Sequence, residues 1–265
     1  MQIGSGTRAL VTGASRGIGR ALAHELADRG ATVGLAARSV HDLEVVALEL
    51  PGAHHVLVCD VAIRASVQAA VDEFVAATGG LDLLIVNAGI AHYAPVAEQD
   101  VETIELMTEV NWLGTVYTIK AGLEHLLADG GGHIVVMSSG AGLRSFPAAA
   151  AYSATKAAQR MFAEAIRHEL HDTGVSVTTV FPGEIATSLL EHQPPREMPE
   201  WYRSEDAAPA EDLAVRVIKA IERDRRDLYW KAPVKGMGIL HGISPRWADR
   251  ALRRLRGDSA APRRD

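Results

Sequence analysis

The sequence is poor in groups that bind metals or cross-link chains. Cys59 is its single cysteine, so neither an internal disulfide nor a cysteine-based metal site can form, and we expect it to be a buried strand residue without chemistry. There is no HExxH motif and no paired-histidine pattern. We therefore predict that the protein binds no metal.

Long apolar runs are also missing. No run approaches the roughly 18 residues that a membrane span needs, and the first eight residues lack the apolar stretch of a secretory signal. We therefore expect a cytoplasmic protein. With 48% hydrophobic and 23% charged residues, the 265-residue chain has enough core for one large α/β domain.

The charge is unevenly distributed along the chain. From Ser244 to the end there are seven arginines and three aspartates, a balance of +4, so the preceding part carries −10 of the total of −6. An acidic body argues against nucleic-acid binding as the main role. Trp247, Ala251 and Leu255 recur at helical spacing among these arginines, which predicts a basic amphipathic helix. Such a helix can lie on an anionic membrane surface, but its short apolar stripe favours packing on the body or on a partner subunit.

Strand-like and helix-like segments alternate along the first 180 residues, which predicts a doubly wound parallel sheet of about seven strands in a single domain, residues 1–265. The predicted strands are Arg8–Thr12, Thr32–Ala36, His55–Cys59, Leu81–Val86, His133–Met137 and Val175–Phe181; the predicted helices are Ile18–Arg29, His41–Leu50, Ile63–Thr78, Val101–Ala128 and Ala151–Asp172. A helix near Ala210–Arg223 and a short strand at Asp227–Lys231 follow, and residues 234–265 form the basic C-terminal extension.

Residues 184–205 interrupt this alternation. The segment combines three prolines, which preclude one long helix, with large apolar side chains that favour burial: Leu189, Leu190, Met198, Trp201 and Tyr202. We predict a mobile lid over an apolar ligand. The alternative is a short helical excursion packed on the body.

Three glycines follow the first predicted strand in Thr12-Gly-Ala-Ser-Arg-Gly-Ile-Gly19. Gly13 allows the sharp turn, Gly17 allows the backbone to approach a pyrophosphate, and Gly19 allows close packing of helix on strand. The helix that begins here presents free N–H groups and a partial positive charge to an anion. The turn therefore predicts a nucleotide site.

Tyr152 and Lys156 lie four residues apart on a predicted helix and so share one face. A free tyrosine has a pKa of about 10. We expect the neighbouring ammonium of Lys156 to lower the pKa of Tyr152, which would suit exchange of a proton with a carbonyl or an alcohol.

The spacing Thr-Gly-x-x-x-Gly-x-Gly resembles that of the short-chain dehydrogenase/reductase family, and five further motifs in order extend the resemblance over about 180 residues. These are Asp60, Asn87-Ala-Gly89, Asn111, Ser139 and Pro182-Gly183 with Ile185 and Thr187. The resemblance implies a Rossmann fold and a catalytic tetrad of Ser139, Tyr152, Lys156 and Asn111. The predicted cofactor-binding residues are Gly13, Ser15, Arg16, Gly17, Ile18, Gly19, Arg38, Ser39, Asp60, Val61, Asn87, Ala88, Gly89, Tyr152, Lys156, Pro182, Gly183, Ile185 and Thr187.

The end of the second predicted strand favours NADP(H) over NAD(H). An NAD enzyme usually places an acid there to bind the ribose 2′-hydroxyl, but the sequence reads Leu35-Ala-Ala-Arg-Ser39, with no carboxylate at Ala37. A 2′-phosphate requires cations, and Arg38 and Arg16 could bind it from two sides.

The resemblance implies hydride transfer between nicotinamide and a substrate carbon, with one proton transfer. Tyr152 would protonate the developing alkoxide, Ser139 would hold the substrate oxygen, and Lys156 would lower the pKa of Tyr152 and bind the nicotinamide ribose. Asn111 would fix a water that relays protons to Lys156. Ser139 lies in no GxSxG motif, which argues against a hydrolase nucleophile.

The expected substrate-lining segments, Gly140–Phe146, His92–Tyr93 and Glu184–Tyr202, are more apolar than charged. We therefore expect a hydrophobic ketone or secondary alcohol, and we expect His92 itself to be a surface residue. A 3-oxoacyl-thioester reductase is the alternative, against which the extension past Lys231 argues. A non-catalytic NADP(H)-binding sensor or scaffold is less favoured, because all four catalytic positions are present. The resemblance also implies a homodimer or homotetramer through the helices that carry Asn111 and Tyr152.

Overall fold

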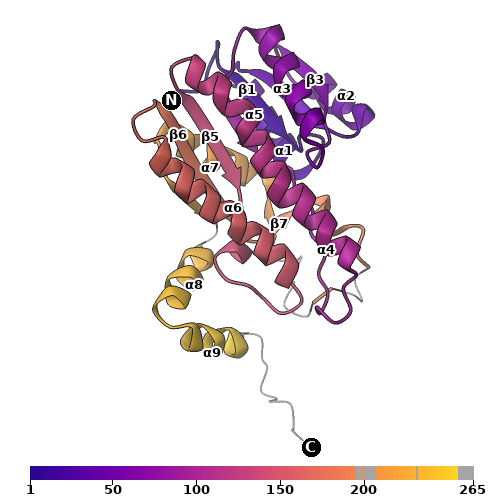
Figure 1. Cartoon of the computed structure of the whole chain (residues 1–265), viewed down its shortest axis with the longest axis vertical. Helices are drawn as coiled ribbons and strands as arrows, with labels where there is room; N and C mark the ends of the chain where they lie inside the picture. Colours follow the sequence, from indigo (N-terminus) through magenta and orange to yellow (C-terminus); the bar gives the residue numbers. More distant parts are fainter. Residues whose placement is uncertain (195–197, 200–206, 231, 256–265) are drawn as a thin grey trace, which may run out of the picture.

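The computed structural model describes residues 1–194, 198–199, 207–230 and 232–255. Of the predicted lid, residues 195–197 and 200–205, which include Trp201 and Tyr202, lie outside these ranges, as do Lys231 and residues 256–265 of the predicted tail. The side chains of Ala251 and Leu255 are not described either. Figure 1 shows a sheet between layers of helices, from which the last two helices extend.

Seven parallel strands form the central sheet, in the order β3-β2-β1-β4-β5-β6-β9. Their bounds are β1 Arg8–Thr12, β2 Thr32–Ala37, β3 His54–Val58, β4 Leu83–Val86, β5 Gly132–Met137, β6 Val175–Pro182 and β9 Asp227–Trp230. The predicted doubly wound sheet of about seven strands is confirmed, with strand bounds that differ by at most two residues from those predicted. A separate two-stranded ribbon pairs β7 Ile185–Ala186 with β8 Ala208–Pro209.

Helices cover both faces of the sheet. Alternate residues of β1 show why: Ala9 and Val11 belong to one buried cluster and Leu10 to another. The first cluster contains the apolar faces of α1 Gly17–Ala27, α2 Val40–Glu49 and α7 Ala210–Glu222; the second contains those of α3 Arg64–Thr78, α5 Gly114–Ala128 and α6 Ala150–Glu169. The strand order reverses between β1 and β4, so a crevice opens beyond the carboxyl ends of these strands, where ligands bind in such folds.

The long helix predicted at Val101–Ala128 has a π-helical segment in its middle. α4 spans Val101–Met107, the π-helix Thr108–Leu113 follows, and α5 continues from Gly114. Asn111 lies in this π-helical segment. Single π-turns inside α-helices occur frequently at functional sites.

The C-terminal extension forms two helices, α8 Ala232–Ile243 and α9 Pro245–Leu255, of which α8 was not predicted. Of the two packings predicted for Trp247, packing on the body is not seen, because 62% of Trp247 is exposed, and packing on a partner subunit stays a prediction. Among the residues of α9 up to Arg250, whose side chains the structure describes, the buried one is the adjacent Ala248, and a step of one residue moves a side chain about 100° around a helix.

Among the helices in the described ranges, none is both long and apolar enough to cross a membrane.

Candidate active site

A cavity of about 1020 Å³ lies at the carboxyl ends of the strands. All but two of the predicted site residues line it. The lining residues that were predicted are Gly13, Ser15, Arg16, Gly17, Ile18, Arg38, Ser39, Asp60, Val61, Asn87, Ala88, Gly89, Ser139, Tyr152, Lys156, Pro182, Gly183, Ile185 and Thr187. Gly19 and Asn111 lie behind this surface. The cavity lies at the upper end of the range usual for ligand sites.

The glycine turn after β1 is shaped by two left-handed residues, Gly13 with φ +69° and Gly17 with φ +55°. A Cβ on Gly19 would lie 2.1 Å from the carbonyl oxygen of Gly13, so only glycine permits this approach of α1 to the turn. α1 has no side-chain cap and no acidic residue in its first turn. Its N-terminal N–H groups and partial positive charge therefore face the cavity without a competing anion.

Thr12 connects the glycine turn to the end of β4, a role that the sequence did not reveal. Its hydroxyl oxygen accepts hydrogen bonds from the backbone N–H groups of Asn87, at 3.0 Å, and Ala88, at 3.2 Å. The Asn87 side-chain amide donates in return to the carbonyl of Thr12 at 3.0 Å. These bonds keep the turn and the Asn-Ala-Gly segment in fixed register on one side of the cavity.

Tyr152 lies in the first turn of α6 and Lys156 in the second, and both line the cavity with Ser139, which follows β5. The Tyr152 hydroxyl is hydrogen-bonded to the Ser139 side chain, and the Ser139 oxygen also accepts from Ala141 N–H at 3.1 Å. Lys156 Nζ donates to the carbonyl of Met137 at 3.0 Å and lies 5.8 Å from the centre of the Tyr152 ring. Ser138 anchors α6 by donating to the carbonyl of Lys156 at 2.8 Å.

The expected lowering of the tyrosine pKa is wrong for the protein alone. Burial raises the pKa of Tyr152 to about 12, against which the hydrogen bond to Ser139 acts only in part. Burial also lowers the pKa of Lys156 to about 7, because no carboxylate compensates its charge. Burial therefore shifts both groups toward their neutral forms: Tyr152 remains protonated at neutral pH, and Lys156 titrates near it.

Asn111 is completely buried, and the protein itself satisfies its side chain. Its Oδ1 accepts from Ile90 N–H at 2.8 Å, and its Nδ2 donates to the carbonyl of Ile90 at 2.9 Å and to Thr155 Oγ1 at 3.0 Å. A Cβ on Gly89 would lie 3.2 Å from Asn111 Oδ1 and 3.4 Å from Lys156 Nζ. Through these hydrogen bonds, Asn111 holds the segment Gly89–Ile90, which follows β4, beside Lys156.

Two exposed arginines line the end of the cavity near the carboxyl end of β2. Neither Arg16 nor Arg38 forms an ion pair within the described part of the chain. Ser39 caps α2 by accepting from Asp42 N–H at 3.3 Å, and Asp42 also lines the cavity, although it was not predicted. Asp60 lies nearby, with its Oδ1 accepting from Ala62 N–H at 3.0 Å.

The other end of the cavity is mostly apolar. Tyr93 packs edge-on against Tyr152, with ring centres 5.7 Å apart, whereas His92 does not line the cavity and lies 5.8 Å from the ring of His192. Of the predicted segment Gly140–Phe146, Gly140, Ala141 and Phe146 line it. The lining residues that the sequence did not single out are Met137, Ile90, Val110, Pro147, Ala148, Ser188 and Val234. Leu189, Leu190 and Pro199, from the predicted lid, also contribute.

Cys59 is buried as expected, and burial raises the pKa of its thiol to about 11. It touches the cavity beside Asp60.

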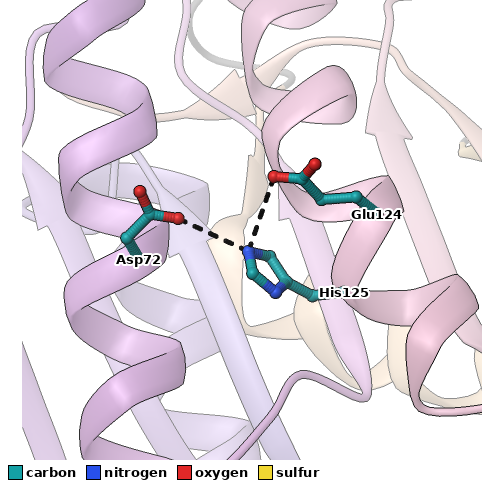
Figure 2. Close-up of side chains that lie close together, drawn as sticks. All are labelled: Asp72, Glu124 and His125. Atoms are coloured by element: carbon teal, nitrogen blue, oxygen red, sulfur yellow. Dashed lines mark ion pairs between the residues drawn. The ribbon is translucent and has the colours of Figure 1, made fainter.

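A group of ionisable residues outside the cavity joins α3 to α5 (Figure 2). His125 Nε2 lies 3.5 Å from Asp72 and 3.8 Å from Glu124. The side-chain amide of Gln68 donates to both carboxylates, at 3.0 and 3.3 Å. The group is therefore a partly exposed network of hydrogen bonds and ion pairs that connects α3 with α5.

Comparison with known proteins agrees with the fold and the site. The family described as short chain dehydrogenase matches residues 7–197. An uncharacterized oxidoreductase of Staphylococcus epidermidis is 34% identical over 187 residues, which are 69% of this chain and 80% of that protein. A short-chain type dehydrogenase/reductase from Mycobacterium marinum superposes with a TM-score of 0.77 at 28% identity, over 86% of this chain and 94% of the other. An alcohol dehydrogenase from Thermococcus sibiricus, solved with 5-hydroxy-NADP, superposes with a TM-score of 0.73 at 29% identity, over 84% of this chain and 94% of the other.

Fold and site together define a nucleotide-binding α/β oxidoreductase. The chain belongs to the short-chain dehydrogenase/reductase family and is an NAD(P)-dependent oxidoreductase.

Proposed function

We propose that the protein is an NADP(H)-dependent enzyme that interconverts a hydrophobic ketone and its secondary alcohol, with Tyr152 as the acid and base. The observation that carries this proposal is the meeting of Tyr152, Ser139 and Lys156 at one cavity with the glycine turn. A non-catalytic sensor would not need a buried, hydrogen-bonded Tyr–Ser pair there.

The residues present fit a nicotinamide dinucleotide. The uncapped N-terminus of α1 behind Gly13 and Gly17 suits a pyrophosphate, and Asp60 and Val61 border the place for the adenine ring. Lys156, Asn87 and Thr187 line the part nearer Tyr152, where the nicotinamide riboside would lie. When bound, the cofactor donates or accepts a hydride.

Arg16 and Arg38 support NADP(H), since both line the cavity and neither is neutralised by a described partner. An arginine fork matches phosphate geometry better than it matches a ribose hydroxyl. The neighbour from Thermococcus sibiricus was solved with an NADP analogue, which is in keeping with this choice. Asp42, exposed at the start of α2, and Asp60 also line the cavity, but neither lies at the end of β2, where Ala37 leaves the strand without a carboxylate.

The chain's own groups provide proton transfer and orientation. Its raised pKa keeps Tyr152 protonated at neutral pH, so Tyr152 holds the proton that it donates to the substrate oxygen during reduction. Ser139 holds the same oxygen by a hydrogen bond where negative charge develops. Lys156, with a pKa of about 7, can accept or release a proton near neutral pH and so replace the one lost by Tyr152.

Substitution of Tyr152 by Phe tests this function. Screening the wild-type protein against a ketone and alcohol library with NADPH and NADH identifies an active pair. Tyr152→Phe should then lower kcat by about 10²- to 10⁴-fold, because it removes the proton donor, and leave the Kd for NADPH within about twofold. Tyr117→Phe on α5, outside the cavity, is the matched control and should retain full activity. Near-normal turnover in Tyr152→Phe would refute the assignment.

A further inference from the structure

We propose that α8 and α9 attach this enzyme to the surface of an anionic lipid bilayer. The surface consists of Ile239, Ile243 and Trp247, with the basic side chains Arg246 and Arg250 beside them. The proposal concerns where the enzyme acts and does not depend on which carbonyl it reduces.

The three apolar side chains of this surface are largely exposed: Ile239 by 55%, Ile243 by 74% and Trp247 by 62%. Ile239 and Ile243 lie four residues apart on α8 and so share one face. Trp247 follows in the first turn of α9, and its N–H donates to the carbonyl of Ser244 at 3.1 Å. Large aromatic and aliphatic side chains next to basic residues are typical of helices that lie in a membrane interface.

Helices α8 and α9 contact the body of the protein, although Figure 1 shows them extending beyond the layers of the fold. Val234 of α8 and Ala248 of α9 are buried. Arg144, which follows the Ser139 segment, is largely buried and forms an ion pair with Asp249 of α9 at 2.5 Å. One side of α8–α9 is therefore fixed to the body, and this fixed placement directs the Trp247 side toward solvent.

The charge of this region matches an anionic surface. Residues from Ser244 onward carry seven arginines and three aspartates. Helix α2 provides an internal contrast, because it also exposes three large apolar side chains, Val40, Val45 and Leu48, but carries the acids Asp42, Glu44 and Glu49. Anionic lipids therefore attract the basic α8–α9 region and repel the acidic helix α2.

The size of the apolar surface favours a bilayer over a second copy of the chain. From their exposed fractions, the three side chains offer roughly 350 Å². A specific protein–protein interface buries about 800 Å² from each partner, of which about 450 Å² is apolar. A membrane interface, by contrast, adds electrostatic attraction from each basic residue near the lipid headgroups.

Attachment by this surface would place the cavity close to the bilayer. Val234 lines the cavity and belongs to the same helix as Ile239 and Ile243. A Cβ on Gly140, the residue after Ser139, would lie 3.2 Å from Val234 Cγ1. One helix thus contributes both to the apolar end of the cavity and to the proposed membrane surface.

Vesicle co-sedimentation of the full-length protein tests the proposal. We expect at least about tenfold tighter binding to phosphatidylcholine vesicles with about 30% phosphatidylserine than to pure phosphatidylcholine, and weaker binding as added salt screens the charges. Ile243→Ser/Trp247→Ser should reduce the affinity at least about tenfold, and Arg246→Gln/Arg250→Gln should weaken the preference for anionic lipid. The matched control Val45→Ser/Leu48→Ser on α2 should bind as the wild type does.

Three results would overturn the proposal. The first is that the wild type shows no preference for anionic vesicles at low salt. The second is that the α2 control loses as much vesicle affinity as Ile243→Ser/Trp247→Ser does. The third is that the wild type binds no vesicles while Ile243→Ser/Trp247→Ser has a lower oligomeric mass than the wild type. The last result would identify a subunit interface. NADPH-dependent turnover without vesicles should be unchanged in every variant, and its absence in the wild type would count against the proposed function alone. Circular dichroism verifies that each variant is folded.

Discussion

The side-chain amide of Gln193 forms hydrogen bonds with both backbone groups of Tyr93. Its Oε1 accepts from Tyr93 N–H at 3.0 Å, and its Nε2 donates to the Tyr93 carbonyl. The Tyr93 ring in turn packs against Tyr152. These hydrogen bonds therefore hold the segment after Leu190 against the loop that contacts Tyr152.

We expect Gln193→Ala to weaken substrate binding without affecting the cofactor. Two buried backbone groups of Tyr93 would lose their partner, and the apolar side of the cavity would loosen. The KM for a hydrophobic ketone should rise about tenfold, while the KM for NADPH should change little. Gln193→Glu keeps the acceptor for Tyr93 N–H, so its KM for the ketone should lie between those of the wild type and Gln193→Ala. Equal changes in both KM values would contradict this local role.

Substitution of Arg38 by Ala should act on NADPH and spare NADH. Removal of the guanidinium that we propose binds the 2′-phosphate should raise the KM for NADPH at least about tenfold, because charge-assisted hydrogen bonds are stronger than neutral ones. Arg20→Ala is the control, since Arg20 is exposed on α1 but pairs with Glu49. Steady-state kinetics with both cofactors measures the effect. An equal rise in the KM for NADH would show that Arg38 does not bind the 2′-phosphate.

The buried His133 should make the fold sensitive to acid. Burial lowers its pKa to about 4 from the usual 6.5, and its ring lies 2.8 Å from Thr178 Oγ1. Between these pH values the unfolded chain binds more protons than the folded one, so stability falls as the pH drops from 6.5 toward 4, by about 3 kcal/mol in total. Urea unfolding across this range measures the slope. It should flatten in His133→Asn and persist in His171→Gln, where the histidine is exposed.

Gly19→Ala should disrupt the nucleotide site. The added Cβ would lie 2.1 Å from the Gly13 carbonyl oxygen and 2.6 Å from Asn87 Nδ2, so the turn must shift. We expect a loss of about 1–3 kcal/mol in unfolding free energy, as for other overpacked sites, together with loss of NADPH binding by fluorescence. Gly236→Ala on α8, where a Cβ meets nothing within 4 Å, should be neutral or slightly stabilising. Unimpaired cofactor binding in Gly19→Ala would contradict this account of the turn.

Much of the sheet and part of the site could be predicted because they depend on local sequence. Continuous apolar runs such as Leu83–Val86 mark strands buried on both faces, and the glycine spacing marks the turn. The structure agrees with the predicted sheet, and the matched family agrees with the predicted class of enzyme. The choice of NADP(H), the substrate class and the homo-oligomer stay predictions.

Features that depend on distant contacts could not be predicted. The pKa of Tyr152 follows from how much protein surrounds it, and spacing to Lys156 carries no such information. Val234 reaches the cavity only because α8 folds back over Gly140. Likewise, the pattern of Trp247, Ala251 and Leu255 indicates an amphipathic helix but cannot tell which side faces the body, and Ala248 occupies that side.

The π-helical segment at Thr108–Leu113 has a consequence for how this chain tolerates changes in length. A π-turn holds one residue more than an α-turn of the same rise. Deleting one residue between Met107 and Asn111 would let α4 run regularly into α5, without breaking either helix. It would also turn Asn111 by about 100° about the axis, away from Ile90 and Thr155. The π-helical segment is thus what places Asn111 against Ile90 and Thr155, and its removal would break the hydrogen bonds of the Asn111 side chain.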